Sequence, residues 1–290
     1  MKANQKAERL SHDGEQRRKT KMGESFPWYI LSLHLSQAIF LFVAAVIGGT
    51  LNAVAGGGSF ISFPALLFTG VPPVQANATN TVALWTGLTA SGGAYLHRLN
   101  VPRRLFLPLL VTSIIGGLAG ALLLLKTPQH TFLHLVPWLL LGATLLFIFG
   151  NRIRAIGGKS VATSELAHTS WQAITLLSFS ELLVGVYGGY FGGGIGIMTL
   201  GMLAAIGMRD IHAMNALRTM LGSVINGVAV LAFILARAVF WPQCAVMIVG
   251  ALVGGWFGAH YSQRADPKKV RYVVIAVGFA MTAYFFVTVY

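Results

Sequence analysis

The stretch GGTLNAVAGGGSFISFPALLFTGVPPVQANATN, residues 48–80, decides how this chain folds. It contains no Asp, Glu, Lys or Arg, and it lies inside a charge-free run from residue 25 to residue 97. A membrane-spanning helix needs about 20 apolar residues. The run is therefore long enough for more than one pass, and its glycines and prolines must determine where each helix ends.

Two breaks divide this run, Gly56-Gly57-Gly58 and Gly70-Val71-Pro72-Pro73. They predict helices near 28–55 and 74–97, with a short apolar helix at 59–70 between them. At 1.5 Å per residue the short helix would cover about 18 Å, which is less than the membrane core of about 30 Å.

Outside its first 25 residues the chain has few charges. Of 290 residues, 55% are hydrophobic and 10% are charged, whereas an average soluble domain is roughly 25% charged. Because so few charges could not cover the surface of a soluble monomer, the composition excludes an ordinary soluble enzyme and a disordered protein. The single cysteine, Cys244, excludes an intramolecular disulfide.

The formal net charge of +13 has a membrane explanation. The basic residues lie in short breaks between apolar runs, which is the pattern of cytoplasmic loops in membrane proteins. A nucleic-acid-binding protein would gather them on one soluble face. We therefore expect a multi-pass protein of the cell membrane that binds no nucleic acid and has a cytoplasmic N-terminus.

The order of long helix, triple glycine and short helix recurs in the second half. There the sequence predicts helices near 172–191, 195–207 and 212–236, with Gly192-Gly193-Gly194 after the first. Further spans are expected at 104–125, 131–150, 241–262 and 271–290. The prediction is an all-α polytopic membrane protein of two homologous repeats, each with about four full transmembrane helices and one short, broken or re-entrant helix.

The same pattern divides the chain into four segments. They are a basic polar N-terminal tail at 1–25, a first transmembrane repeat at 26–150, a polar linker at 151–170 and a second repeat at 171–290.

Basic residues bear on the number of crossings, because they favour the cytoplasmic side. Eight full spans place 14 basic residues inside and 6 outside, whereas ten spans place 9 inside and 11 outside. A nine-span arrangement, in which only the second short helix crosses, agrees best with this rule, because it places 18 basic residues inside and 2 outside. It would give two copies of one unit different topologies, so we prefer eight spans. Whether the repeats are parallel or inverted stays open.

The two triple glycines are the most informative feature of the sequence. Each glycine costs about 1 kcal/mol relative to alanine inside a helix. Irregular backbone in a membrane is tolerated only within protein or beside a water-filled cavity. Broken segments at matching positions of two halves point to a transporter binding site, and the N–H groups at a helix start can hold an anion. Close helix packing is the alternative, and we prefer it for the GxxxG spacings at Gly116/Gly120 and Gly250/Gly254/Gly258.

Polar side chains follow each short helix, and Arg218 stands out among them because an intramembrane arginine is costly. Its planar guanidinium suits an oxyanion, although it could instead reach the membrane interface or pair with Glu181. The candidate substrate-binding residues are Asn52, Gly56, Gly57, Gly58, Ser59, Asn77, Thr79, Asn80, Gly192, Gly193, Gly194, Asn215 and Arg218.

Two further residues are candidates for coupling transport to an ion. Glu181 is the only acid inside an apolar run of the second half, and His212 lies near Arg218 in the sequence. Glu181 could titrate in proton coupling or merely neutralise a neighbour, and the sequence leaves open whether the coupled ion is a proton or sodium. We expect no cofactor and no metal site, and the sequence leaves the oligomeric state open.

At this point the residues resemble a known family. Gly49 and the run from Asn52 to Phe60, followed by Pro64-Ala65-Leu66 and the segment Ala76-Asn77-Ala78-Thr79-Asn80, are similar to the first repeat of the TauE/SafE membrane transporters. Gly192-Gly193-Gly194-Ile195-Gly196 and Asn215-Ala216-Leu217-Arg218 resemble the second repeat. The resemblance implies a small anionic substrate such as sulfite, a sulfonate, sulfoacetate or thiosulfate.

The second repeat departs from the first at the positions that follow its asparagine. Leu217-Arg218 stands where the first repeat has Thr79-Asn80, and Leu200 stands where it has Pro64. A symmetric pair of sites is therefore not expected.

Taken together, these features predict a secondary transporter that moves a small anion across the cytoplasmic membrane by alternating access, and not an enzyme. One alternative is an anion channel whose glycine segments form a filter. A membrane-embedded enzyme is a weaker alternative, because no catalytic motif and no carboxylate pair lies in a span.

Overall fold

The computed structural model describes residues 33–92, 101–156, 170–205, 208, 211–261 and 267–290. The chain divides into two units, Met1–Leu35 and Ser36–Tyr290. Of the first unit only residues 33–35 are described, and the helical architecture belongs to the second unit.

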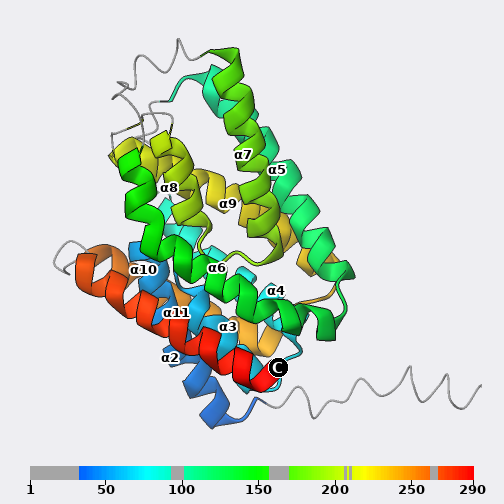
Figure 1. Ribbon diagram of the computed structural model, residues 1–290. Coiled ribbons are helices and arrows are strands. Elements are labelled where there is room, and N and C mark those ends of the chain that lie inside the picture. The colour runs from blue at the N-terminus through cyan, green and yellow to red at the C-terminus, as the bar shows by residue number, and fades with distance from the viewer. Residues whose placement is uncertain (1–32, 93–100, 157–169, 206–207, 209–210, 262–266) are drawn as a thin grey trace, which may run out of the picture. The chain divides into compact units, whose positions relative to one another are not determined.

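The described part of the chain is helical apart from its connecting segments (Figure 1). Its helices are α2 (Leu35–Ala55), α3 (Ser59–Phe68), α4 (Pro73–Gly92), α5 (Arg103–Lys126), α6 (Gln129–Ile156), α7 (Trp171–Tyr190), α8 (Ile195–Ala205), α9 (Ile211–Leu235), α10 (Trp241–Tyr261) and α11 (Pro267–Val289). The all-α prediction is confirmed.

Six of these helices, α2, α5, α7, α9, α10 and α11, are long and apolar enough to cross a membrane. Helices α4 and α6 are also of spanning length, at 20 and 28 residues. The two short apolar helices, α3 and α8, have 10 and 11 residues, which is about 15 Å of helix and too little to cross the bilayer core. The number of crossings and the two-repeat organisation stay predictions.

Most predicted helix ends lie within a few residues of the observed ones, with two clear exceptions. Helix α2 begins at Leu35, whereas the sequence predicts a start near residue 28. Leu33 and His34 are described and are not helical. Helix α6 continues to Ile156, whereas the sequence predicts an end near residue 150, so residues 151–156 of the predicted linker are helical.

The predicted tail at 1–25 and most of the predicted linker, residues 157–169, lie outside the described residues. The predicted helix end near residue 97 lies outside the described residues as well.

The helix breaks fall at the triple glycines for a conformational reason. Gly56 has a φ of 78° and Gly192 has a φ of 80°, a left-handed backbone that glycine adopts without a Cβ penalty. The N–H of Gly56 donates to the Leu51 and Asn52 carbonyls, and that of Gly192 donates to the Tyr187 carbonyl. These bonds close the ends of α2 and α7 as left-handed glycine caps.

Glycines also bring helices into backbone contact. A Cβ on Gly120 of α5 would overlap the Val186 carbonyl of α7, and a Cβ on Gly254 of α10 would overlap the Val46 carbonyl of α2. Helices α5 and α7 accordingly run side by side (Figure 1). The prediction that the GxxxG spacings pack helices together is confirmed at these two contacts.

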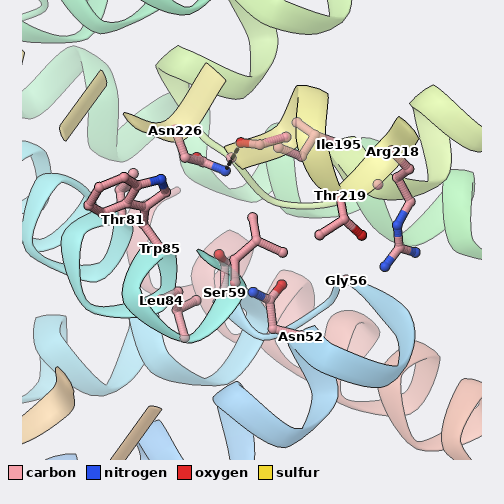
Figure 2. A pocket seen from close by; sticks show the side chains of 14 residues that line it. Asn52, Gly56, Ser59, Thr81, Leu84, Trp85, Ile195, Arg218, Thr219 and Asn226 are labelled. Carbon is pink, nitrogen blue, oxygen red and sulfur yellow. Dashed lines mark hydrogen bonds between the residues drawn. The ribbon is translucent and has the colours of Figure 1, made fainter. Parts of the chain in front are cut away.

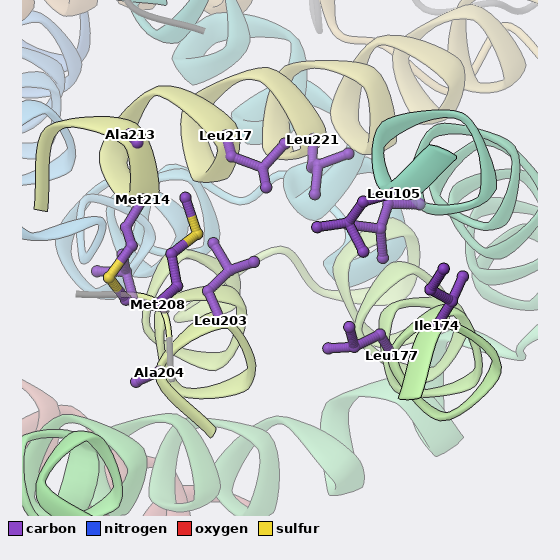
Figure 3. Packing of buried hydrophobic residues seen from close by; sticks show 12 residues of the cluster. Leu105, Ile174, Leu177, Leu203, Ala204, Met208, Ala213, Met214, Leu217 and Leu221 are labelled. Carbon is purple, nitrogen blue, oxygen red and sulfur yellow. The ribbon is translucent and has the colours of Figure 1, made fainter. Parts of the chain in front are cut away.

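A buried hydrophobic cluster holds α5, α7, α8 and α9 together (Figure 3). On α9 the cluster includes Leu217 and Leu221, whereas Arg218 and Gly222, one residue further on, line a pocket. The cluster therefore fixes which face of α9 turns toward the candidate site.

Candidate functional site

A pocket of about 50 Å³ lies where the two glycine breaks meet (Figure 2). It is lined by Asn52, Gly56, Ser59, Thr81, Leu84, Trp85, Leu88, Gly192, Ile195, Gly196, Arg218, Thr219, Gly222 and Asn226. Pockets for drug-sized ligands measure about 300–1,000 Å³, so this pocket has room only for a small ion or a few waters.

The starts of the two short helices converge on this pocket. Ser59 is the first residue of α3 and Ile195 is the first residue of α8, and both line the pocket. A Cβ on Gly56 would lie 3.9 Å from the Cα of Gly196, so the two breaks approach each other closely. The start of a helix carries a partial positive charge, although at α3 the N–H groups of Phe60 and Ile61 already donate to the preceding glycine carbonyls. Two such ends therefore act on the same small space.

Arg218 contributes the only formal charge among the described residues that line the pocket. It is partly buried, and Figure 2 draws its side chain among those that line the pocket. A Cβ on Gly196 would lie 3.4 Å from Cδ and from Nε of Arg218. The arginine side chain therefore lies directly beside the start of α8.

Two polar side chains of the pocket are engaged with their own helices. The Thr81 hydroxyl donates to the Asn77 carbonyl over 2.8 Å. The Asn226 amide donates to the Gly222 carbonyl over 2.9 Å (Figure 2). Asn52, Ser59 and Thr219 supply further polar groups to the lining.

Trp85 joins the two sides of the pocket. Its indole N–H on α4 donates to the Ser223 carbonyl on α9 over 2.9 Å, and a Cβ on Gly227 would lie 3.3 Å from the indole ring. The bond ties α4 to α9, and both helices line the pocket.

Five of the predicted site residues line the pocket together. They are Asn52, Gly56, Ser59, Gly192 and Arg218. The other described candidates, Gly57, Gly58, Asn77, Thr79, Asn80, Gly193, Gly194 and Asn215, are not among its lining residues.

The polar candidates on α4 instead hold neighbouring elements in place. The Asn77 amide donates to the Tyr190 carbonyl over 3.0 Å, at the end of α7. The Thr79 hydroxyl accepts the Phe240 N–H over 3.0 Å, just before α10. The Asn80 amide donates to the Ser59 hydroxyl over 3.2 Å.

The remaining glycines of the two breaks shape the backbone. The Gly57 carbonyl accepts the Phe60 N–H, and a Cβ on Gly58 would overlap the Gly48 carbonyl. Gly194 has a φ of 83°, and its carbonyl accepts the N–H groups of Ile197 and Met198. A Cβ on Gly193 would lie 2.9 Å from the Phe191 ring.

Of the two coupling candidates, Glu181 is not among the described residues that line the pocket. Glu181 is fully buried on α7, where the Ser113 hydroxyl of α5 donates to its Oε1 over 2.7 Å. His212 lies in α9, but its side chain is outside the described residues. Within the described ranges, no group of three or more His, Cys, Asp or Glu side chains could hold a metal ion.

Nine of the lining residues are not among the predicted substrate-binding residues, although Thr81 and Thr219 belong to the polar clusters that follow the short helices. The nine are Thr81, Leu84, Trp85, Leu88, Ile195, Gly196, Thr219, Gly222 and Asn226. The available signal was spacing, since residues 81, 84, 85 and 88 share one helix face, and so do Arg218, Gly222 and Asn226.

The class is that of a multi-pass membrane transporter. The chain has helices long and apolar enough to span a membrane, two short helices that each follow a triple glycine, and a small pocket at the starts of those short helices. The model of the family described as "Sulfite exporter TauE/SafE" matches residues 41–285. The chain therefore belongs to the TauE/SafE family, as its resemblance predicted.

Curated relatives carry transporter names and not enzyme names. The chain is 30% identical over 256 residues to a "Probable membrane transporter protein ORF9" of a Sinorhizobium species, which covers 87% of this chain and 92% of the relative. It is 28% identical to a probable membrane transporter protein of Haemophilus influenzae, and the match covers 84% of this chain and 92% of the relative. It is 26% identical to the probable membrane transporter protein YfcA of Escherichia coli K12, and the match covers 84% of this chain and 87% of the relative. No solved structure matches the chain.

Proposed function

We propose that the chain is a secondary transporter for a small anion, a sulfur oxyanion or an organosulfonate, and that it works by alternating access. One observation carries the proposal: Arg218 and the starts of α3 and α8 border the same 50 Å³ pocket. A guanidinium can bind two oxygens of an oxyanion at once, and helix starts favour negative charge.

The rest of the pocket fits the same substrate class. The described residues of its lining include no acidic side chain, so none of them repels an anion. The pocket volume matches a small oxyanion better than a large metabolite. The family description names sulfite for the family as a whole, and the choice of sulfur oxyanion for this chain rests on that description.

Alternating access is supported by the origin of the pocket walls. Helices α2, α3 and α4 come from the first predicted repeat, and α8 and α9 come from the second. In transporters built from repeats, the substrate binds between the repeats, and their rocking opens the site to each side in turn. Glu181, His212 and sodium stay candidates for coupling.

Anion binding to purified protein tests the proposal. We expect thermal stabilisation by sulfite, sulfoacetate or thiosulfate, and little by acetate. Arg218→Ala should weaken that binding by at least about tenfold, since a hydrogen bond to a charged group contributes about 1.5–3 kcal/mol.

Arg103→Gln is the matched control, because Arg103 is exposed at the start of α5 and does not line the pocket. It should bind anions like the unmodified protein. Equal binding by Arg218→Ala would overturn the assigned site, and stabilisation by none of the anions would overturn the substrate class.

A further inference from the structure

A buried network of hydrogen bonds lies directly behind one wall of the pocket. It joins Ser59 and Ser62 of α3 to Asn80 of α4, and Ser62 and Asn80 are both at most 1% exposed. The Asn80 Nδ2 donates to the Ser59 hydroxyl over 3.2 Å. The Ser62 hydroxyl lies 2.5 Å from the Asn80 Oδ1. Of the three residues, only Ser59 lines the pocket.

The two distances fix the direction of the Asn80 amide. A separation of 2.5 Å between Ser62 and Asn80 fits an O–H···O bond and is too short for N–H···O, whereas 3.2 Å between Asn80 and Ser59 fits N–H···O. The amide oxygen therefore faces Ser62, and the amide nitrogen faces Ser59. Reversing the amide would place an N–H group at the short contact.

This direction has a consequence for Ser59. A serine hydroxyl has one proton to donate and lone pairs to accept. Since Ser59 accepts from Asn80, its own proton stays available for a further acceptor. Among the described residues no acceptor for that proton is found, and Ser59 borders the pocket.

We propose that Asn80 is a positioning residue that fixes the Ser59 hydroxyl as a hydrogen-bond donor to the anion, on the α3 side of the pocket. The inference rests on the proposed function, because it assumes that an anion occupies the pocket. It assigns to Asn80 a role through Ser59 and not through direct contact. An oxyanion would then meet Arg218 from one repeat and a directed hydroxyl from the other.

A double-mutant cycle with Ser59→Ala and Asn80→Leu tests the inference. Leucine has the same number and branching of side-chain heavy atoms as asparagine and adds no charge, and Ser62 keeps the Gly58 carbonyl as an acceptor at 3.0 Å. The measurement is the dissociation constant of purified protein for sulfite and thiosulfate. Ser59→Ala should weaken binding about tenfold and Asn80→Leu about three- to tenfold, because a bond to an anion is stronger than a neutral one.

The double variant shows whether Asn80 affects anion binding through Ser59 or independently of Ser59. If Asn80 acts through Ser59, the double variant binds no more weakly than Ser59→Ala alone. Ser59→Thr keeps the hydroxyl and should bind close to the unmodified protein. Thr175→Val is the control for removing a hydroxyl, because Thr175 is exposed and bonded to its own helix.

Three results would overturn the inference while anion binding by the unmodified protein remains. They are unchanged binding in Asn80→Leu, additive losses in the double variant, or equal losses in Ser59→Thr and Ser59→Ala. If Asn80→Leu does not fold, Ser62→Ala replaces it, since it removes the donor that orients the amide and should also weaken binding. Failure of the unmodified protein to bind any anion would instead contradict the proposed function.

Discussion

At the scale of single residues, the pocket is unequal on its two sides. The sequence places Arg218 where the first predicted repeat has Asn80. Arg218 lines the pocket, whereas Asn80 lies behind Ser59. A charged donor therefore stands on one side and a neutral, indirectly positioned donor on the other. A single charge in the described lining is a reason to expect one anion per pocket.

Gly58, at the start of α3, is packed so closely that a side chain there should destabilise the protein. Gly58→Ala should destabilise the protein by about 1–3 kcal/mol, the usual cost of overpacking, because its Cβ would overlap the Gly48 carbonyl and lie 2.9 Å from the Asn52 Cβ. The backbone at Gly58 is right-handed, with a φ of −59°, so the effect is steric and not conformational. Thermal unfolding in detergent measures it.

Gly142→Ala in α6 is the matched control, since nothing lies within 4 Å of a Cβ at that position. It should unfold at the same temperature as the unmodified protein or slightly above it, because alanine is the better helix residue. Equal unfolding temperatures for the two variants would mean that the α2–α3 break is loosely packed.

Gly56, Gly192 and Arg218 of the pocket could be predicted from the sequence as site residues, whereas most of the residues on its other walls could not. Triple glycines and an intramembrane arginine are costly unless they serve a purpose, so both are visible without a structure. Which face of α4 turns toward the pocket is not visible in this way, because a membrane helix is apolar on several sides. Asn80 and Thr81 are neighbours in the sequence, yet only Thr81 lines the pocket.

At the scale of elements, the site depends on helices that touch through backbone. Helix α10 packs on α2 at Gly254, where the Thr50 hydroxyl of α2 also donates to the Gly254 carbonyl over 2.9 Å. Helix α2 leads directly to Asn52 and Gly56 of the pocket. A shift between α2 and α10 would therefore move one wall of the site.

Adjacent glycines on α10 give a matched pair of variants for this contact. Gly254→Ala should lower stability by about 1–3 kcal/mol, because its Cβ would overlap the Val46 carbonyl. Gly255→Ala should leave stability unchanged, because its Cβ would lie 3.7 Å from the Gly87 carbonyl, which is an ordinary contact. Thermal unfolding of both variants checks this, and equal losses would show that the α2–α10 contact is not the tight one.

The helices themselves were predictable because their ends carry local signals. Glycines with positive φ end α2 and α7, and the Ser170 hydroxyl caps α7 by accepting the Ala173 N–H over 3.2 Å. The start of α2 was predicted too early. The apolar residues that precede Leu35 extend the hydrophobic run without a capping signal, so the run alone overestimates the helix.

At the scale of the whole molecule, the pocket is the proposed substrate site of a carrier. Its walls come from both predicted repeats, and the bond from Trp85 to Ser223 joins α4 of the first to α9 of the second. A carrier must change the arrangement of these walls in each cycle. A channel would conduct through a path that stays open.

Counterflow in proteoliposomes tests most directly whether the chain is such a carrier. Vesicles that contain the unmodified protein and a high internal concentration of unlabelled sulfite should transiently accumulate radiolabelled sulfite from outside, with a saturable initial rate. Arg218→Gln should abolish the accumulation, whereas Arg103→Gln should retain it. Two results would contradict a carrier whose anion site includes Arg218. One is counterflow that is unchanged in Arg218→Gln. The other is a flux that rises linearly with sulfite concentration and does not depend on the internal anion.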